Sequence, residues 1–206
     1  MLFHLPLAGS AFKKVYYDAV RGRAVSKFVP AEDVVMPYVS TDMESCERVT
    51  HVVKTMSNEL RKKQVSGMYR DIEVNMSPTE KNVAGEKYDD LDGIKQTQNS
   101  EDIVLLEFHC DLDIPGFEDK NSQTGEATGI KLPYVVTVDE GSGKVLSIYR
   151  NYQENDPLRK KIQYFVHYKF LPGLGFYGFG LIHMLGGLSR TATSALRQLI
   201  DAGTLS

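Results

Sequence analysis

The sequence predicts an α+β protein with a strand-rich body, short surface helices and a long C-terminal amphipathic helix. Runs rich in Val, Ile, Tyr and Thr recur through residues 1–170 between Gly, Pro, Asn and Asp, as in strands joined by turns. Beyond residue 180, apolar residues recur at steps of three or four, the period of a helix. We therefore expect a body over 1–170, a glycine- and aromatic-rich joint over 171–180 and a stem-like helix over 181–206.

The composition is that of a folded protein, and its 206 residues suffice for one or two domains. Cys46 and Cys110 lie far apart without CxxC spacing, so we expect two reduced thiols, with no metal and no other cofactor. The apolar start MLFHLPL lacks the basic residues that precede the apolar part of a signal peptide. Because no apolar run reaches the ~18 residues of a membrane span, no membrane partner is expected.

The strands are expected in six segments. Residues 11–30 predict two strands about the turn DAVRGR, followed by an extended segment over 31–42. Two Val- and Ile-rich runs flank Glu140-Gly141-Ser142-Gly143, which predicts a hairpin over 132–151. Single strands are expected over 46–56, 103–114 and 160–170.

Two short helices are expected between the strands. Ser57 is predicted to cap a helix that Gly67 ends. The run Ser77-Pro78-Thr79-Glu80 is a capping box with proline at the first helical position, and it predicts a polar surface helix over 80–93.

The C-terminal helix carries a single apolar stripe. Over residues 181–202 it would be about 33 Å long, with Gly203 just beyond its end. Arg190 and Arg197 lie off the stripe. A rod of this length needs packing partners, and the residues expected to contact them are Leu181, Leu185, Leu188, Ala192, Leu196 and Leu199.

The joint before this helix contains the pattern GxGxxGxG. A dinucleotide-binding fingerprint requires the same pattern between a strand and a helix, but also a second strand after the helix, for which too few residues follow here. The alternative is a flexible joint whose glycines permit unusual backbone conformations and whose aromatic residues bury against the body. Its residues are Gly173, Gly175, Phe176, Tyr177, Gly178, Phe179 and Gly180.

No constellation predicts catalysis. His109, Cys110 and Asp111 are consecutive, but in a strand neighbouring side chains point to opposite faces. A buried cysteine and a histidine at the rim are therefore expected there. The sequence contains no GxSxG, HExxH, P-loop or paired-carboxylate pattern, so we expect no enzyme.

Charge is unevenly distributed along the chain. Residues 141–206 contain eight Lys or Arg and three Asp or Glu, although the whole chain has a net charge of −3. This excess indicates either an anionic partner or a neighbouring surface of complementary charge for the C-terminal third.

Two long passages resemble portal proteins of short-tailed bacteriophages. The first is FVPAEDVVMPYVSTDMESCERVTHVVKTMSNELRKKQ, where Val29 to Asp33, Arg48 to Met56 and Asn58-Glu59-Leu60 match the family pattern. The second runs from the predicted hairpin through KKIQYFVHYKFLPGLGFYGFGLIHMLGGLSRTATSALRQLIDAG, and its aromatic-glycine joint is the most specific part.

The resemblance implies a structural subunit of a head-to-tail connector in the virion, assembled in the host cytoplasm. In that family about twelve copies form a closed ring, which docks the terminase large subunit and tail or adaptor proteins. The ring encloses the channel through which double-stranded DNA is packaged and ejected. It contacts this DNA without sequence specificity. Portal subunits are several times longer, so the resemblance implies an internal fragment covering a clip-like sheet and the start of a stem helix.

Candidate DNA-facing or inter-subunit cations are Lys160, Lys161 and Lys169 on the strand before the joint and Arg190 and Arg197 on the helix. Two other functions stay open on the sequence alone. One is a small enzyme that binds a phosphate or nucleotide at residues 173–180, and the other is a general nucleic-acid-binding module.

Overall fold

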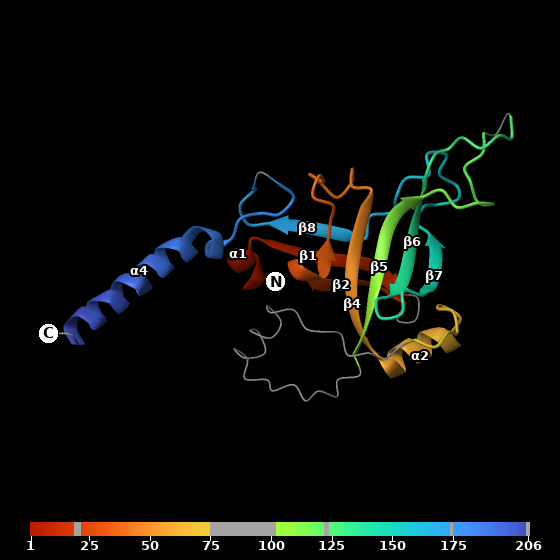
Figure 1. Cartoon of the computed structure of the whole chain (residues 1–206). Helices are drawn as coiled ribbons and strands as arrows, with labels where there is room; N and C mark the ends of the chain where they lie inside the picture. The colour runs from red at the N-terminus through yellow and green to blue at the C-terminus, as the bar shows by residue number, and fades with distance from the viewer. Residues whose placement is uncertain (19–21, 75–101, 122–123, 174, 205–206) are drawn as a thin grey trace. The chain divides into compact units, whose positions relative to one another are not determined.

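The computed structural model describes residues 1–18, 22–74, 102–121, 124–173 and 175–204, and it confirms the α+β class (Figure 1). The chain divides into two compact units, Met1–Cys46 with Gln163–Ser206, and Glu47–Ile162. Residues 1–170, expected to form a single body, therefore contribute to both units. The predicted capping box at 77–80 and the helix after it lie outside the described residues.

The first unit joins the two ends of the sequence. It contains the three-stranded antiparallel sheet β2-β1-β8, the two-residue strand β3 and the long helix α4. Its elements are α1 (His4–Ala8), β1 (Ser10–Asp18), β2 (Arg23–Pro30), the 3-10 helix η1 (Ala31–Asp33), β3 (Val34–Val35), β8 (Phe165–Lys169) and α4 (Leu181–Thr204).

Three expectations for this unit need correction. The segment expected to be extended begins instead with η1, whose acidic residues lie within its single turn. The strand expected over 160–170 begins only at Phe165, because the register with β1 runs from Phe165 to Lys169 and does not include residues 160–164. Gly203 lies inside α4 and does not follow it.

The register of this sheet explains its core. Phe12 lies opposite Val29 on one side and His167 on the other, so these side chains share one face of the sheet. Phe12, Val29 and Phe165 are buried, whereas the next residue of β8, Val166, points to the other face and is exposed.

The second unit is a meander with one helix. Its strands pair antiparallel in the order β4-β5-β6-β7, with β7 at an edge. The elements are β4 (Arg48–Met56), α2 (Ser57–Val65), β5 (Asp102–Leu112), β6 (Leu132–Asp139) and β7 (Val145–Arg150). The predicted hairpin is confirmed, and the carboxylate of Asp139 accepts hydrogen bonds from the Ser142 N–H at 2.9 Å and hydroxyl at 2.6 Å.

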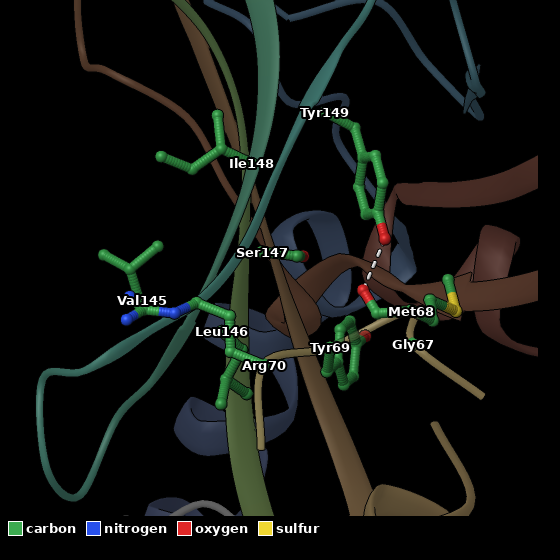
Figure 2. Close-up of a pocket in the computed structure, with 9 residues that line it drawn as sticks. All are labelled: Gly67, Met68, Tyr69, Arg70, Val145, Leu146, Ser147, Ile148 and Tyr149. Atoms are coloured by element: carbon green, nitrogen blue, oxygen red, sulfur yellow. Dashed lines mark hydrogen bonds between the residues drawn. The ribbon is translucent and has the colours of Figure 1, made fainter. Parts of the chain in front are cut away.

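The segment after α2 runs beside the outer edge of β7. The Arg70 N–H donates to the Leu146 carbonyl at 2.9 Å, and the Tyr149 hydroxyl donates to the Met68 carbonyl (Figure 2). Gly67 ends the helix as predicted, since its φ is +75° and its N–H donates to the Gln64 carbonyl. Ser57 is the first helical residue and not the cap, because the preceding position is Met56, with no side-chain capping bond.

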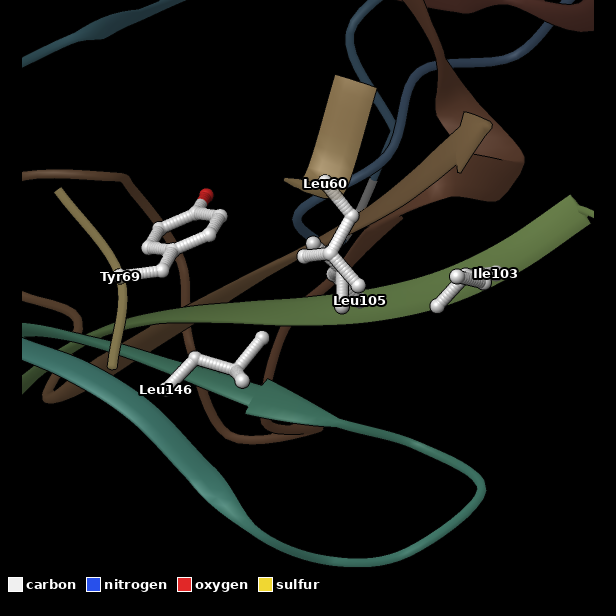
Figure 3. Close-up of a cluster of buried hydrophobic side chains, with 5 residues drawn as sticks. All are labelled: Leu60, Tyr69, Ile103, Leu105 and Leu146. Atoms are coloured by element: carbon white, nitrogen blue, oxygen red, sulfur yellow. The ribbon is translucent and has the colours of Figure 1, made fainter. Parts of the chain in front are cut away.

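One face of this sheet packs on α2 through a small apolar core. Leu60 from the helix meets Ile103 and Leu105 of β5, with Tyr69 and Leu146 completing the cluster (Figure 3). Leu105 and Leu146 are 1% and 0% exposed, so this cluster is closed to solvent.

Replacing Leu105 by Ala should destabilise the second unit by about 2–5 kcal/mol, because the change removes buried methyl groups and leaves a cavity. Urea unfolding followed by tyrosine fluorescence measures the loss. The matched control is Leu158→Ala, since Leu158 is 73% exposed and belongs to the same unit. Equal stability of the two variants would contradict this description of the core.

Candidate interface at the joint and the C-terminal helix

The joint is a closed loop whose two ends pair with each other. Leu171 and Phe179 form an antiparallel bridge, in which the Phe179 N–H donates to the Leu171 carbonyl at 2.8 Å. The chain therefore leaves β8, turns back on itself and enters α4 at a defined point.

The loop fits against Gly9 through direct backbone contact. A Cβ added to Gly178 would lie 2.6 Å from the Gly9 oxygen, and one added to Gly180 would lie 2.3 Å from the Leu7 oxygen. Gly9 itself has a φ of +87°, and a Cβ there would lie 2.3 Å from the Gly178 oxygen. Such distances exclude any side chain, so these glycines are required because two backbones touch.

This contact corrects the reason expected for the glycines. Gly173, Gly175, Gly178 and Gly180 are all described, and none of these four has a positive φ. Close approach, and not an unusual backbone conformation, explains Gly173, Gly178 and Gly180, whereas a Cβ on Gly175 would meet no atom within 4 Å.

A stack of three rings fixes the joint to the sheet. His167 lies 4.4 Å from the Phe12 ring centroid and 4.5 Å from that of Phe176, with nearly parallel planes. Phe176 is 6% exposed, which confirms the expected aromatic burial at this position. Tyr177 and Phe179 are 43% and 46% exposed, so the burial expected of the joint's aromatic residues is wrong for these two. The Tyr177 hydroxyl nevertheless donates to the Val34 carbonyl at 2.8 Å.

Ser10 links the stack to the loop. Its hydroxyl accepts the Gly178 N–H at 2.8 Å and lies 3.1 Å from Nε2 of His167. Burial between the rings, followed by the positive charge of Lys169, lowers the pKa of His167 to about 4. The imidazole is therefore neutral near pH 7 and acts as a packing ring.

The helix that leaves the joint is exposed along its whole length. Every residue of α4 is solvent-exposed, including the six residues predicted to contact packing partners. Leu188, Leu196 and Leu199 are 69%, 63% and 72% exposed. Ile182, Met184 and Ile200 widen the apolar face, since helical geometry places them beside the predicted stripe.

The middle of α4 is a poor helix by intrinsic propensity. Gly186 and Gly187 together cost about 2 kcal/mol relative to alanine. The hydroxyls of Thr191 and Thr193 compete for backbone carbonyls four residues earlier, at 3.0 and 2.9 Å. An amphipathic helix of this composition draws most of its stability from packing of its apolar face.

The cations proposed to face DNA do not form a single cluster. Lys160 and Lys161 belong to the second unit and precede β8, so their expected place on that strand was wrong. Lys169 ends β8, with its ammonium 5.7 Å from the Phe176 ring centroid. Arg190 and Arg197 lie on the polar side of α4, about 10 Å apart along the helix.

A row of buried and partly buried polar side chains in the second unit was not predicted. His51, Glu107, Thr137 and Ser147 are successive cross-strand neighbours from β4 to β7 and share one face of the sheet. The Glu107 carboxylate lies 2.6 Å from Nε2 of His109. The sequence did contain a signal for this row. Along one face of β5 the alternate residues change from apolar, at Ile103 and Leu105, to polar, at Glu107 and His109.

The environment of the row raises the pKa of Tyr69 to about 12, first through burial and then through the negative charge of Glu107. His109 is buried, contrary to its expected place at the rim, and Cys110 is only partly buried, with its thiol pKa raised mainly by burial. These two side chains point to opposite faces of β5, as predicted.

Among the described residues, no group of three or more His, Cys, Asp and Glu side chains is arranged to hold a metal ion. The described helices also include none that is both long and apolar enough to cross a membrane.

No family model and no curated protein matches the chain, so the resemblance to portal proteins stays a prediction.

Replacing Gly178 by Ala should destabilise the first unit by about 1–3 kcal/mol or more, because its Cβ would collide with backbone atoms that cannot move away. Thermal unfolding of the whole chain measures the change. Gly175→Ala is the matched control in the same loop, since a Cβ at that position is in open space. Similar melting temperatures for both variants would contradict the backbone contact with Gly9.

The stability of the first unit should fall as the pH is lowered from 6.5 towards 4. In this range unfolded His167, with an ordinary pKa of 6.5, takes up a proton that the folded ring with a pKa near 4 does not. His167→Phe keeps a stacking ring but cannot titrate, so its pH dependence should be shallower than that of the unsubstituted chain. Titration of the His167 ring by NMR measures the folded pKa, and a value near 6.5 would contradict the effect of burial.

Proposed function

We propose that this chain is a structural subunit of a bacteriophage portal, which forms a ring around a DNA channel at one vertex of the virion. The ring serves packaging and ejection of the genome and docks the terminase large subunit and tail or adaptor proteins. The proposal assigns no catalytic activity to the chain.

The observation that carries the proposal is the exposed apolar face of α4. A contiguous surface of Leu, Ile, Met and Ala over 24 residues is rarely left in water by a stable protein and marks an interaction site. Small residues between Gly186 and Ala195 would let a second helix approach closely. Equivalent helices from neighbouring copies therefore make suitable partners.

The joint supports the same proposal. Direct backbone contact at Gly9 and the Phe12–His167–Phe176 stack hold the first turn of α4 to the sheet. A ring subunit needs such a fixed exit angle, because a closed symmetric assembly repeats one geometry at every interface.

The polar side of α4 fits a DNA channel. Arg190 and Arg197 place two positive charges two helical turns apart, and Asp201 is the helix's one acidic residue. Scattered arginines attract phosphates without reading bases, which suits a channel through which DNA of any sequence slides.

The geometry of the joint disfavours the phosphate-binding alternative. An anion site in a glycine-rich loop needs backbone N–H groups that point at the ligand. Here the Gly178 N–H donates to the Ser10 hydroxyl, and the Gly180 N–H donates to Nδ1 of His183 at 3.1 Å. A phosphate would have to displace both bonds.

Leu188→Asp should abolish self-assembly, because a carboxylate in the middle of a packed apolar face would lose its hydration. Light scattering gives the mass of the assembly, and electron micrographs show whether it is a ring with a central hole. Ser194→Asp is the matched control, since helical geometry places Ser194 on the opposite, polar side of α4. A monomer at all concentrations for the unsubstituted chain, or equal assembly of both variants, would refute the role of α4.

A further inference from the structure

We propose that the outer edge of β7 binds an extended acidic segment of a partner protein, which adds to the sheet as a further strand beside Ile148 and Arg150. This site lies in the second unit and does not depend on the ring or on α4.

The hydrogen-bond pattern shows which backbone groups face outward. The Asp139 N–H donates to the Lys144 carbonyl, and the Asn151 N–H donates to the Pro133 carbonyl, so both ends of the β6–β7 ladder are hydrogen-bonded pairs. Hydrogen-bonded and non-hydrogen-bonded pairs alternate in an antiparallel ladder. Ile148 opposite Val136 and Arg150 opposite Tyr134 are therefore non-hydrogen-bonded pairs, with N–H and C=O directed away from β6.

One backbone hydrogen bond to the outer side of β7 is already formed within the chain. The Leu146 carbonyl, on the same outward side, accepts the Arg70 N–H at 2.9 Å. Beyond this bond, no backbone group of the described residues reaches the outward N–H or C=O of Ile148 or Arg150. An extended peptide can pair with these groups without breaking a backbone hydrogen bond of the described residues.

A hollow of about 390 Å³ opens beside this edge. It is lined by Gly67–Arg70 on one side and Val145–Tyr149 on the other, and the Tyr149 side chain reaches across to the Met68 carbonyl (Figure 2). Alternate side chains of an added strand would point towards and away from this face of the sheet. One side chain of the partner can therefore enter the hollow next to Tyr69.

Ser147 supplies an unused polar group at the hollow. The residue is 7% exposed, and its Oγ has no hydrogen-bond partner among the described residues. A buried hydroxyl without a partner costs free energy that a ligand can recover. A polar side chain entering the hollow beside β7 would meet this hydroxyl.

Charge selects an acidic partner. Arg70 and Arg150 are exposed at the two ends of the open edge. Arg150 is paired with Glu154 at 2.6 Å, but this pair is solvent-exposed and exchangeable. Pairing of two β7 edges from two copies would place two like-charged Arg150 side chains, one from each copy, on one ladder, so a second copy in that arrangement is disfavoured.

The probe is a synthetic heptapeptide of alternating Glu and Val, with a Lys and Val peptide of the same length as its charge-reversed counterpart. Titration of the ¹⁵N-labelled chain should shift the amide resonances of Ile148 and Arg150, with binding at least ten-fold tighter for the Glu peptide. No shift at millimolar peptide, equal binding of both peptides, or shifts confined to other strands would overturn the proposal.

Ile148→Pro is the decisive variant, since it removes the outward N–H of a residue that makes no ladder bond to β6. It should abolish binding of the Glu peptide, whereas Ile148→Val should retain it. Because proline can strain the strand, Ser147→Ala provides a second measurement and should weaken binding several-fold with the fold intact. Shifts of the Ile148 and Arg150 resonances with chain concentration alone, without peptide, would identify a second copy as the occupant and overturn the heterologous partner.

Discussion

The first unit depends on contact between two backbones that are far apart in the sequence. Gly9 touches Gly178 and the chain next to Gly180 so closely that no side chain fits at any of the three positions. The same two regions pair as β1 and β8, and Phe12, His167 and Phe176 stack beside them. Such a contact closes a loop of more than 150 residues, and folding of the second unit within that loop would lower the entropic cost of closing it.

This constraint determines how α4 is presented. The loop from Leu171 to Phe179 is closed by its own bridge and held by Ser10, so the helix starts at a fixed place on the sheet. Beyond that point α4 has no contact that buries any of its residues. A rigid base and an unpartnered apolar face together suit a subunit that is completed by its neighbours, as the portal proposal requires.

In the second unit, the polarity of one sheet face changes along the strands. Near α2 the face is apolar, with Leu105 and Leu146 closed to solvent. Further along the same face, buried His109 pairs with partly buried Glu107, whose negative charge adds to burial in raising the pKa of Tyr69. At the edge of the same sheet, Ser147 and the outward groups of β7 are left for a partner.

Local signals in the sequence determined the strands of the hairpin, the first strand pair, the end of α2 at Gly67 and the amphipathic α4. These elements follow from turn residues and from apolar residues repeating every two positions in strands or every 3.6 in helices. Both signals involve only residues close together in the sequence. Only the tertiary structure decided that β8 joins β1, that the joint glycines serve close approach to Gly9, and that His109 is buried. Each of these depends on residues more than 50 positions apart in the chain, or on partners from other strands, and local periodicity carries no information about such contacts.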